Sequence, residues 1–171
     1  MTPSSFNEAD YHFNLGVFYQ GRGDLRRALR EYREALKLDP SNARVHNNIG
    51  VIYKEMGLLD EAIEEYRKAL EIDPGYAKAL NNLGVALYVK GDLKGAEEAL
   101  RKSIKIDPGN PASYVNLGLI LKKRGLIDRA IDMFRKAISI DRECAEAYYN
   151  LALTLEGMGR IEAAIGYYER F

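Results

Sequence analysis

Asparagine recurs at intervals of 34 residues along this chain, and its chemistry suggests a binding function. The recurring set is Asn14, Asn48, Asn82, Asn116 and Asn150. A side-chain amide offers two N–H donors and one carbonyl acceptor, and a peptide backbone offers one donor and one acceptor per residue. Asparagine is also a poor helix former, costing about half a kcal/mol relative to alanine inside a helix. Its repeated use therefore suggests that the amides hold a ligand, and an extended peptide matches them.

No set of residues predicts catalysis or metal binding. The sequence contains no phosphate-binding loop, no dinucleotide-binding glycine motif, and no HExxH or GxSxG motif. The two histidines and the single Cys144 are too few for a metal site or a disulfide framework. Acidic pairs such as Glu64–Glu65 and Glu97–Glu98 are typical of solvated helix faces. We therefore expect no enzymatic activity and no cofactor.

The composition narrows the class of partner. The chain has 171 residues, of which 47% are hydrophobic, and its 25 basic residues balance its 25 acidic ones. This balance argues against a nucleic-acid binder, which would normally be basic. No apolar run approaches the length of a membrane span, and the first residues lack the pattern of a signal peptide. A cytoplasmic location and a protein or peptide partner are the expectations.

The elements that must position the asparagines follow from the same period. Segments 15–48, 49–82, 83–116 and 117–150 align without gaps, and a fifth copy begins at Leu151 and stops at Phe171. Each copy shows apolar residues at spacings of three and four, then a glycine, then a second amphipathic stretch such as 59–72. The pattern predicts two helices per copy, with the glycine in the left-handed conformation that closes a helix. The glycines are Gly23, Gly57, Gly91, Gly125 and Gly159.

Further residues indicate where the helices begin and end. Asn42 and Asn110 are expected N-caps, and Pro111 suits a first helical turn. The second helix ends at an Asp-Pro pair in three copies, since proline cannot continue a helix. These pairs are Asp39-Pro40, Asp73-Pro74 and Asp107-Pro108.

These residues resemble the tetratricopeptide repeat (TPR) family, whose signature positions recur in phase over residues 9 to 171. Counting position 1 from Ala9, Ala43, Ala77, Pro111 and Ala145, position 8 is glycine in four copies and position 20 is alanine in all five. Position 24 is Tyr32, Tyr66, Phe134 and Tyr168, with Leu100 in the third copy. The family's first-helix tryptophan is absent, and Arg142 stands where the closing proline is expected.

The resemblance implies an all-α fold, a right-handed superhelical solenoid of antiparallel helix pairs. The implied limits are a lead-in over 1–8 and repeats over 9–42, 43–76, 77–110, 111–144 and an incomplete 145–171. One repeat cannot bury its apolar face alone, so stability comes from stacking on its neighbours.

The resemblance also implies a ligand site, because positions 2, 5, 6, 9, 12 and 13 of each first helix tend to face the concave groove in this family. The asparagine column at position 6 is similar to that of the TPR superhelix of O-linked N-acetylglucosamine transferase. Two readings of the column stay open, namely contact with a peptide backbone and a mainly structural role. The predicted peptide-binding residues are Asn14, Asn47, Asn48, Val51, Lys78, Asn81, Asn82, Val85, Tyr88, Asn116, Leu119, Lys122, Lys123 and Asn150.

The charges of this surface suggest the ligand's chemistry. Lys78, Lys122 and Lys123 favour a mildly acidic and partly apolar peptide. The family's clamp for chaperone tails is not expected, since position 5 is never lysine and position 9 is never asparagine here.

The last repeat raises two alternatives to a simple scaffold. With nothing covering the final helix, Ala164, Ile165 and Tyr168 are expected to be partly exposed. The protein could then self-assemble through its uncapped ends as a homo-oligomer, or through insertion of residues 1–6, MTPSSF, into another copy. It could instead be the substrate-recognition arm of a larger enzyme that continues beyond Phe171.

Overall fold

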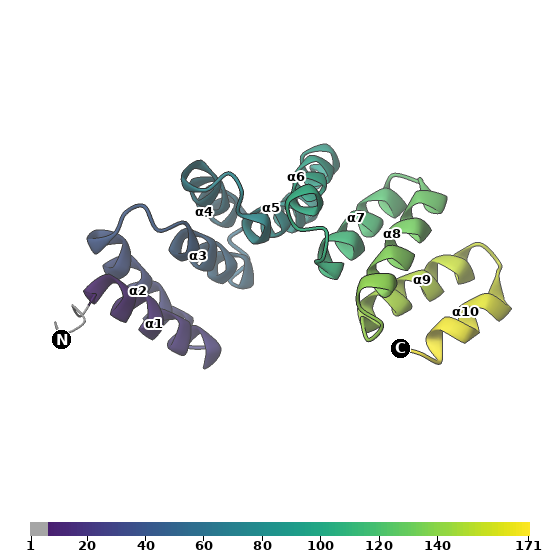
Figure 1. Cartoon of the computed structure of the whole chain (residues 1–171), viewed down its shortest axis with the longest axis horizontal. Helices are drawn as coiled ribbons and strands as arrows, with labels where there is room; N and C mark the ends of the chain where they lie inside the picture. The colour runs from purple at the N-terminus through teal and green to yellow at the C-terminus, as the bar shows by residue number, and fades with distance from the viewer. Residues whose placement is uncertain (1–6) are drawn as a thin grey trace, which may run out of the picture. The chain divides into compact units, whose positions relative to one another are not determined.

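A computed structural model describes residues 7–171, and in this part of the chain all the regular structure is helical (Figure 1). The MTPSSF segment lies outside the described residues. The helices are α1 (Glu8–Gly21), α2 (Leu25–Leu38), α3 (Ala43–Glu55), α4 (Leu59–Ile72), α5 (Ala77–Lys90), α6 (Leu93–Ile106), α7 (Pro111–Lys123), α8 (Ile127–Ile140), α9 (Ala145–Gly157) and α10 (Ile161–Tyr168). The all-α class expected from the period is confirmed.

Each 34-residue period contains one pair of helices joined by a tight turn. The pairs α1–α2, α3–α4, α7–α8 and α9–α10 are in contact along their lengths. The glycine that ends each first helix has a positive φ between 74° and 88°, as in Gly159 and Gly91. This left-handed conformation is costly for residues with a Cβ, so the glycines set the turn as predicted.

Helix starts also follow the sequence. The side chain of Asn42 accepts a hydrogen bond from the N–H of Val45, and that of Asn110 accepts one from Ala112, with Pro111 at the first helical position. Both predicted N-caps are confirmed. The aspartates Asp24 and Asp92 cap α2 and α6 in the same way.

Second helices end at an aspartate in four repeats. The carboxylate of Asp73 accepts from the N–H of Gly75 at 2.9 Å, and that of Asp141 accepts from Glu143 at 2.9 Å. Asp39 and Asp107 make the same bond to the residue two places on. Proline follows only three of these aspartates, yet α8 ends at the equivalent residue, so the aspartate turn suffices to end the helix.

Close contact between the two helices of a repeat needs the small residues at positions 8 and 20. A Cβ on Gly16, Gly50, Gly84 or Gly118 would lie within 3.0 Å of the side chain at position 24 of the same repeat. The alanines at position 20, such as Ala28 and Ala62, have no exposed surface. The position 24 side chain therefore lies directly over the first helix.

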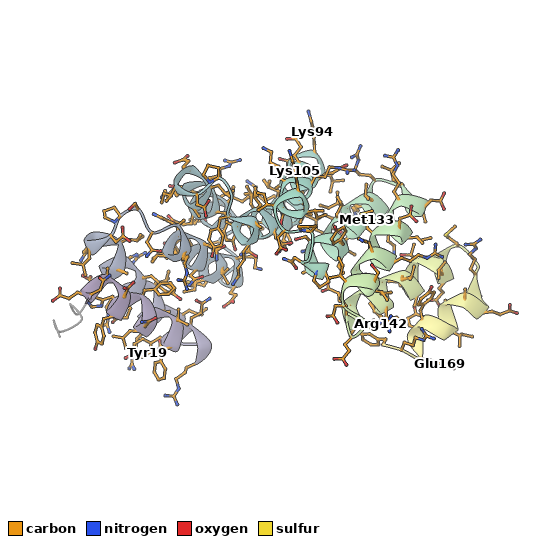
Figure 2. The ribbon with its side chains drawn as sticks, viewed as in Figure 1. Tyr19, Lys94, Lys105, Met133, Arg142 and Glu169 are labelled. Carbon is orange, nitrogen blue, oxygen red and sulfur yellow. The ribbon has the colours of Figure 1, made fainter. Side chains whose placement is uncertain are left out.

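The chain forms two compact units, which divide within α5 between Asn82 and Leu83. In the first unit, α2 also contacts α3, and in the second unit α7 contacts α6, α8 and α9. Lys94 and Lys105 on α6 are examples of charged side chains that lie on the surface of a second helix (Figure 2).

Candidate functional site

The asparagines of the first unit form a chain of hydrogen bonds that links three repeats. Asn82 Nδ2 donates to Asn47 Oδ1 at 2.9 Å, and Asn47 Nδ2 donates to Asn48 Oδ1 at 3.2 Å. Asn48 Nδ2 in turn donates to the Tyr32 hydroxyl at 3.1 Å, and that hydroxyl donates to Gln20 Oε1 at 2.8 Å. We call these five side chains the amide chain. It gives Asn47, Asn48 and Asn82 a structural role.

The members of the amide chain differ in how far their side chains are buried. Asn47 has an exposed fraction of 0%, and both of its amide atoms are bonded to other asparagines. Its side chain therefore has no surface to offer a peptide, and we assign it the role of holding Asn48 and Asn82. Asn48, Asn82 and Asn81 are half-buried, and Asn14 is exposed.

The tyrosines at position 24 differ in how their hydroxyls are satisfied. Burial raises the pKa of Tyr32 to about 12, although the hydrogen bond from Asn48 partly offsets this effect. Burial also raises the pKa of Tyr66, and the charge of Glu55 adds to the rise. The Tyr66 hydroxyl is buried and has no hydrogen-bond partner among the described residues. Both phenols are therefore neutral near neutral pH.

In the second unit, four of the predicted site residues gather around one hollow. Val85 and Tyr88 on α5 and Asn116 and Leu119 on α7 line it, and Glu146 of α9 lies at its edge. The remaining lining residues are Val89, Leu100 and Ile120, and the volume is about 250 Å³. We call this space the α5–α7 hollow. It combines a mainly apolar lining with one neutral amide and one carboxylate.

Other predicted residues of the second unit behave differently. Asn150 is almost buried, and its Nδ2 donates to the backbone carbonyl of Glu146 in its own helix at 2.8 Å. The amide at position 6 thus has four different environments in this protein, namely the amide chain for Asn48 and Asn82, the hollow for Asn116, its own helix backbone for Asn150, and an exposed surface for Asn14.

The lysines of the predicted site remain available to a partner. Lys78 and Lys123 are exposed, whereas Lys122 is half-buried, and burial lowers its pKa below the ordinary value. In the described part of the chain, no ion pair within 4.0 Å involves any of the three. Val51 at position 9 is half-buried.

The residues predicted for self-association divide in two. The expectation that Ala164 is partly exposed is wrong, because its exposed fraction is 1%. It occupies position 20, which packs on the first helix of its own repeat and so needs no following repeat. Ile165 is 50% exposed, whereas its counterparts Leu29, Ile63 and Ile131 are 8% or less exposed. Tyr168 is half-buried and donates to Glu156 at 2.7 Å.

Two acidic residues that were expected on solvated faces are in fact largely buried. The Glu65 side chain is 14% exposed, and its Oε2 accepts from His46 Nδ1 at 2.7 Å. Burial alone would raise the pKa of Glu65, but hydrogen bonds from His46 and Lys68 bring it below its ordinary value. Glu97 is held by Arg101 and by Arg124 of the next repeat. The corresponding pair in the first repeat is His12 with Glu31.

Sequence reasoning missed these pairs because nothing in the local spacing marks them. Histidine and glutamate lie 19 residues apart, on the two different helices of a repeat. The only available signal was that position 4 is histidine in the two repeats where position 23 is glutamate.

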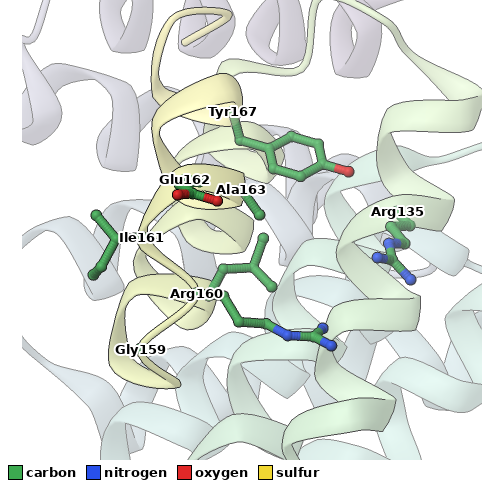
Figure 3. A pocket seen from close by; sticks show the side chains of 8 residues that line it. Arg135, Gly159, Arg160, Ile161, Glu162, Ala163 and Tyr167 are labelled. Atoms are coloured by element: carbon green, nitrogen blue, oxygen red, sulfur yellow. The ribbon is translucent and has the colours of Figure 1, made fainter.

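A larger pocket, of about 650 Å³, lies away from the predicted site (Figure 3). Arg135 of α8 lines it together with Arg160, Glu162 and Tyr167 at α10. Figure 3 shows the Arg160 guanidinium and the Tyr167 hydroxyl directed toward the side on which Arg135 lies. In the sequence, the feature that distinguishes this pocket is Arg160, which occupies the repeat position at which Asp24 and Asp92 cap earlier helices.

Two other kinds of feature are absent from residues 7–171. Neither a group of three or more metal-ligating His, Cys, Asp or Glu side chains nor a helix long and apolar enough to cross a membrane is found in that range.

The repeats match models of a known protein family. Three family models described as tetratricopeptide repeat match residues 13–77, 55–118 and 111–170. The curated proteins gave no match.

Solved structures give several matches over most of the chain. A crystal structure of MamA is 31% identical with a TM-score of 0.78, and the match covers 91% of each chain. PilF of Pseudomonas aeruginosa is 30% identical with a TM-score of 0.89, covering 96% of this chain and 75% of its own. A thermophilic TPR protein of Thermus thermophilus, TTC0263, is 24% identical with a TM-score of 0.79, covering 95% and 89%, and shows a similar fold.

Proposed function

Since the chain belongs to the tetratricopeptide repeat family, we propose that it is a non-catalytic interaction scaffold that binds an extended peptide segment of a partner protein along its first helices. The observation that carries this proposal is the α5–α7 hollow. Four residues chosen from their repeat positions, Val85, Tyr88, Asn116 and Leu119, line it together. An apolar space with a neutral amide at its wall is the kind of surface on which a peptide side chain and backbone can both be satisfied.

Charge supports a preference within this class of ligand. Lys122 follows Leu119 by three residues, so it lies one turn further along the same face of α7. Its half-buried ammonium has no carboxylate partner among the described residues and would gain one from an acidic residue of the peptide. We expect binding to weaken with salt, since exposed charges are screened over about 10 Å at 0.1 M ionic strength.

The asparagines divide between the two readings that the sequence left open. In the first unit, Asn48 and Asn82 already use one N–H each within the amide chain. Their removal would leave the Asn47 amide without partners and would take one of its two hydrogen bonds from the Tyr32 hydroxyl, so a change in binding there could not be separated from a change in stability. Position 9 offers a cleaner test, because Val85 and Leu119 in the second unit are half-buried and contribute only apolar surface.

The test is a peptide-binding measurement with two variants at position 9 of the second unit. Phage-displayed random peptides of about twelve residues, roughly 40 Å when extended, are selected on the protein, and labelled copies are titrated by fluorescence anisotropy. Val85→Glu and Leu119→Glu should each lower the affinity about tenfold or more, because each introduces a charge where the peptide packs.

The matched control is Lys94→Glu on the exposed face of α6, where affinity should stay unchanged. Equal losses in all three variants, or full binding in both position 9 variants, would contradict a site on the first helices.

A second candidate function is self-association, and one observation favours it. Ile165 is exposed at a position that is buried in every earlier repeat except the third, where Glu97 stands. An apolar side chain at a position that normally contacts a following repeat can pack on another copy of the chain.

A further inference from the structure

One departure from the repeat pattern adjoins the α5–α7 hollow. Position 24 is filled by the rings of Tyr32, Tyr66 and Phe134, all of which have no exposed surface. The third repeat has Leu100 at this position, which likewise has no exposed surface and lies among the residues that line the hollow. A leucine occupies less space than a phenyl ring, so a ring at this position would extend further toward the hollow.

The size and lining of the hollow indicate a side chain as its occupant. Its volume of about 250 Å³ lies below the roughly 300–1,000 Å³ of typical small-molecule sites. Val85, Leu119 and Ile120 give it apolar walls, and the Tyr88 ring adds a flat surface. A leucine, isoleucine, methionine or phenylalanine side chain would bury its apolar surface there.

The edge of the hollow carries a single charge. Glu146 is exposed, and its carboxylate takes part in no ion pair within 4.0 Å among residues 7–171. Asn150 donates to the backbone carbonyl of Glu146, so that bond leaves the carboxylate oxygens available. An acidic peptide residue at this edge would be repelled, whereas a lysine or arginine would gain a partner.

We propose that the α5–α7 hollow binds one apolar side chain of the partner peptide and that Glu146 selects a lysine or arginine next to that side chain. This inference rests on the proposed peptide-binding function and specifies the residue that anchors the peptide. It also places a basic residue beside the anchor, with the acidic positions of the ligand left to Lys122 and Lys123, further along α7.

The experiment fills the hollow while keeping the repeat pattern. Leu100→Phe introduces the residue that Phe134 already provides at position 24 of the fourth repeat. Peptides selected on the unaltered protein should carry an apolar residue next to a basic one. Their affinity for Leu100→Phe should fall about tenfold or more, the loss expected when one apolar side chain can no longer be buried.

Three further variants complete the experiment. Val85→Phe narrows the hollow from α5 and gives the same prediction should Leu100→Phe fold poorly by circular dichroism. Phe134→Leu is the control, since it changes the same position in a repeat whose side chain does not line the hollow, and it should bind the peptides with affinity unchanged. Selection on Glu146→Lys should no longer enrich the basic residue.

The outcomes separate this inference from the proposed function. If Leu119→Glu loses binding while Leu100→Phe and Val85→Phe keep it, the peptide site stands and the hollow is not its anchor. Continued enrichment of the basic residue on Glu146→Lys would overturn the role of Glu146. If no peptide is selected on the unaltered protein, both proposals fall.

Discussion

At the scale of single residues, the hydroxyls of Tyr32 and Tyr66 show how one neighbour changes the energetics of a repeated position. Tyr32 donates to Gln20, whose amide oxygen can accept. The residue corresponding to Gln20 in the second repeat is Lys54, which can only donate, and Asn82 donates to Asn47 rather than to Tyr66. The Tyr66 hydroxyl is therefore left buried without a partner, which costs about 1–3 kcal/mol.

We predict that Tyr66→Phe leaves the free energy of unfolding unchanged or raises it by about 1 kcal/mol, because the variant removes an unsatisfied group. Phe134 shows that a phenyl ring fits this position. Tyr32→Phe is the matched comparison and should lower the free energy of unfolding by about 1 kcal/mol, since Gln20 and Asn48 lose their partner. Urea denaturation measures both. Similar destabilisation by the two variants would mean that Tyr66 does find a partner in solution.

At the scale of helices, the end of α8 shows whether the aspartate or the proline that usually follows it ends the second helix of a repeat. Asp39, Asp73 and Asp107 are followed by proline and Asp141 by Arg142, yet all four carboxylates accept the N–H two residues on. The aspartate turn therefore ends the helix, and proline adds rigidity to the chain that follows. The closing proline of the sequence pattern is a secondary feature.

This division of roles predicts opposite effects for two neighbouring changes. Arg142→Pro should raise the free energy of unfolding by about 0.4–1 kcal/mol, because proline restricts the unfolded chain and three sibling turns already accept it. Asp141→Ala should lower it by about 1 kcal/mol through loss of the turn hydrogen bond. Thermal unfolding of both variants is the measurement, and a stabilised Asp141→Ala would contradict the role given to the carboxylate.

At the scale of the whole molecule, exposure of Ile165 bears on self-association. If this side chain packs on another copy, light scattering after size exclusion should give a mass above 19.3 kDa at high concentration, and Ile165→Arg should restore the mass of one chain. Ile106→Arg is the control, because the apolar residue at that position is exposed in the first three repeats, as in Leu38 and Ile72. A mass of one chain for the unaltered protein at every concentration would exclude this association.

The sequence by itself determined the features that depend on residues close together in the chain. Spacing within one turn or one helix determines the helices, the Asn42 and Asn110 caps and the positive-φ glycines, because local geometry leaves little choice there. Repetition of this spacing every 34 residues then gives the helix pairs. It also marked the first-helix residues that line the hollow, because the repeat assigns each position a face.

Tertiary structure decided the features that depend on which side chains meet across helices. The amide chain joins residues 16 and 35 positions apart, and the His–Glu pairs join residues 19 apart, so no local pattern announces them. Burial of Asn47 made it structural, and packing of position 20 on its own repeat buried Ala164. Leu100 was visible in the sequence as a departure, but only packing placed it among the residues that line the α5–α7 hollow.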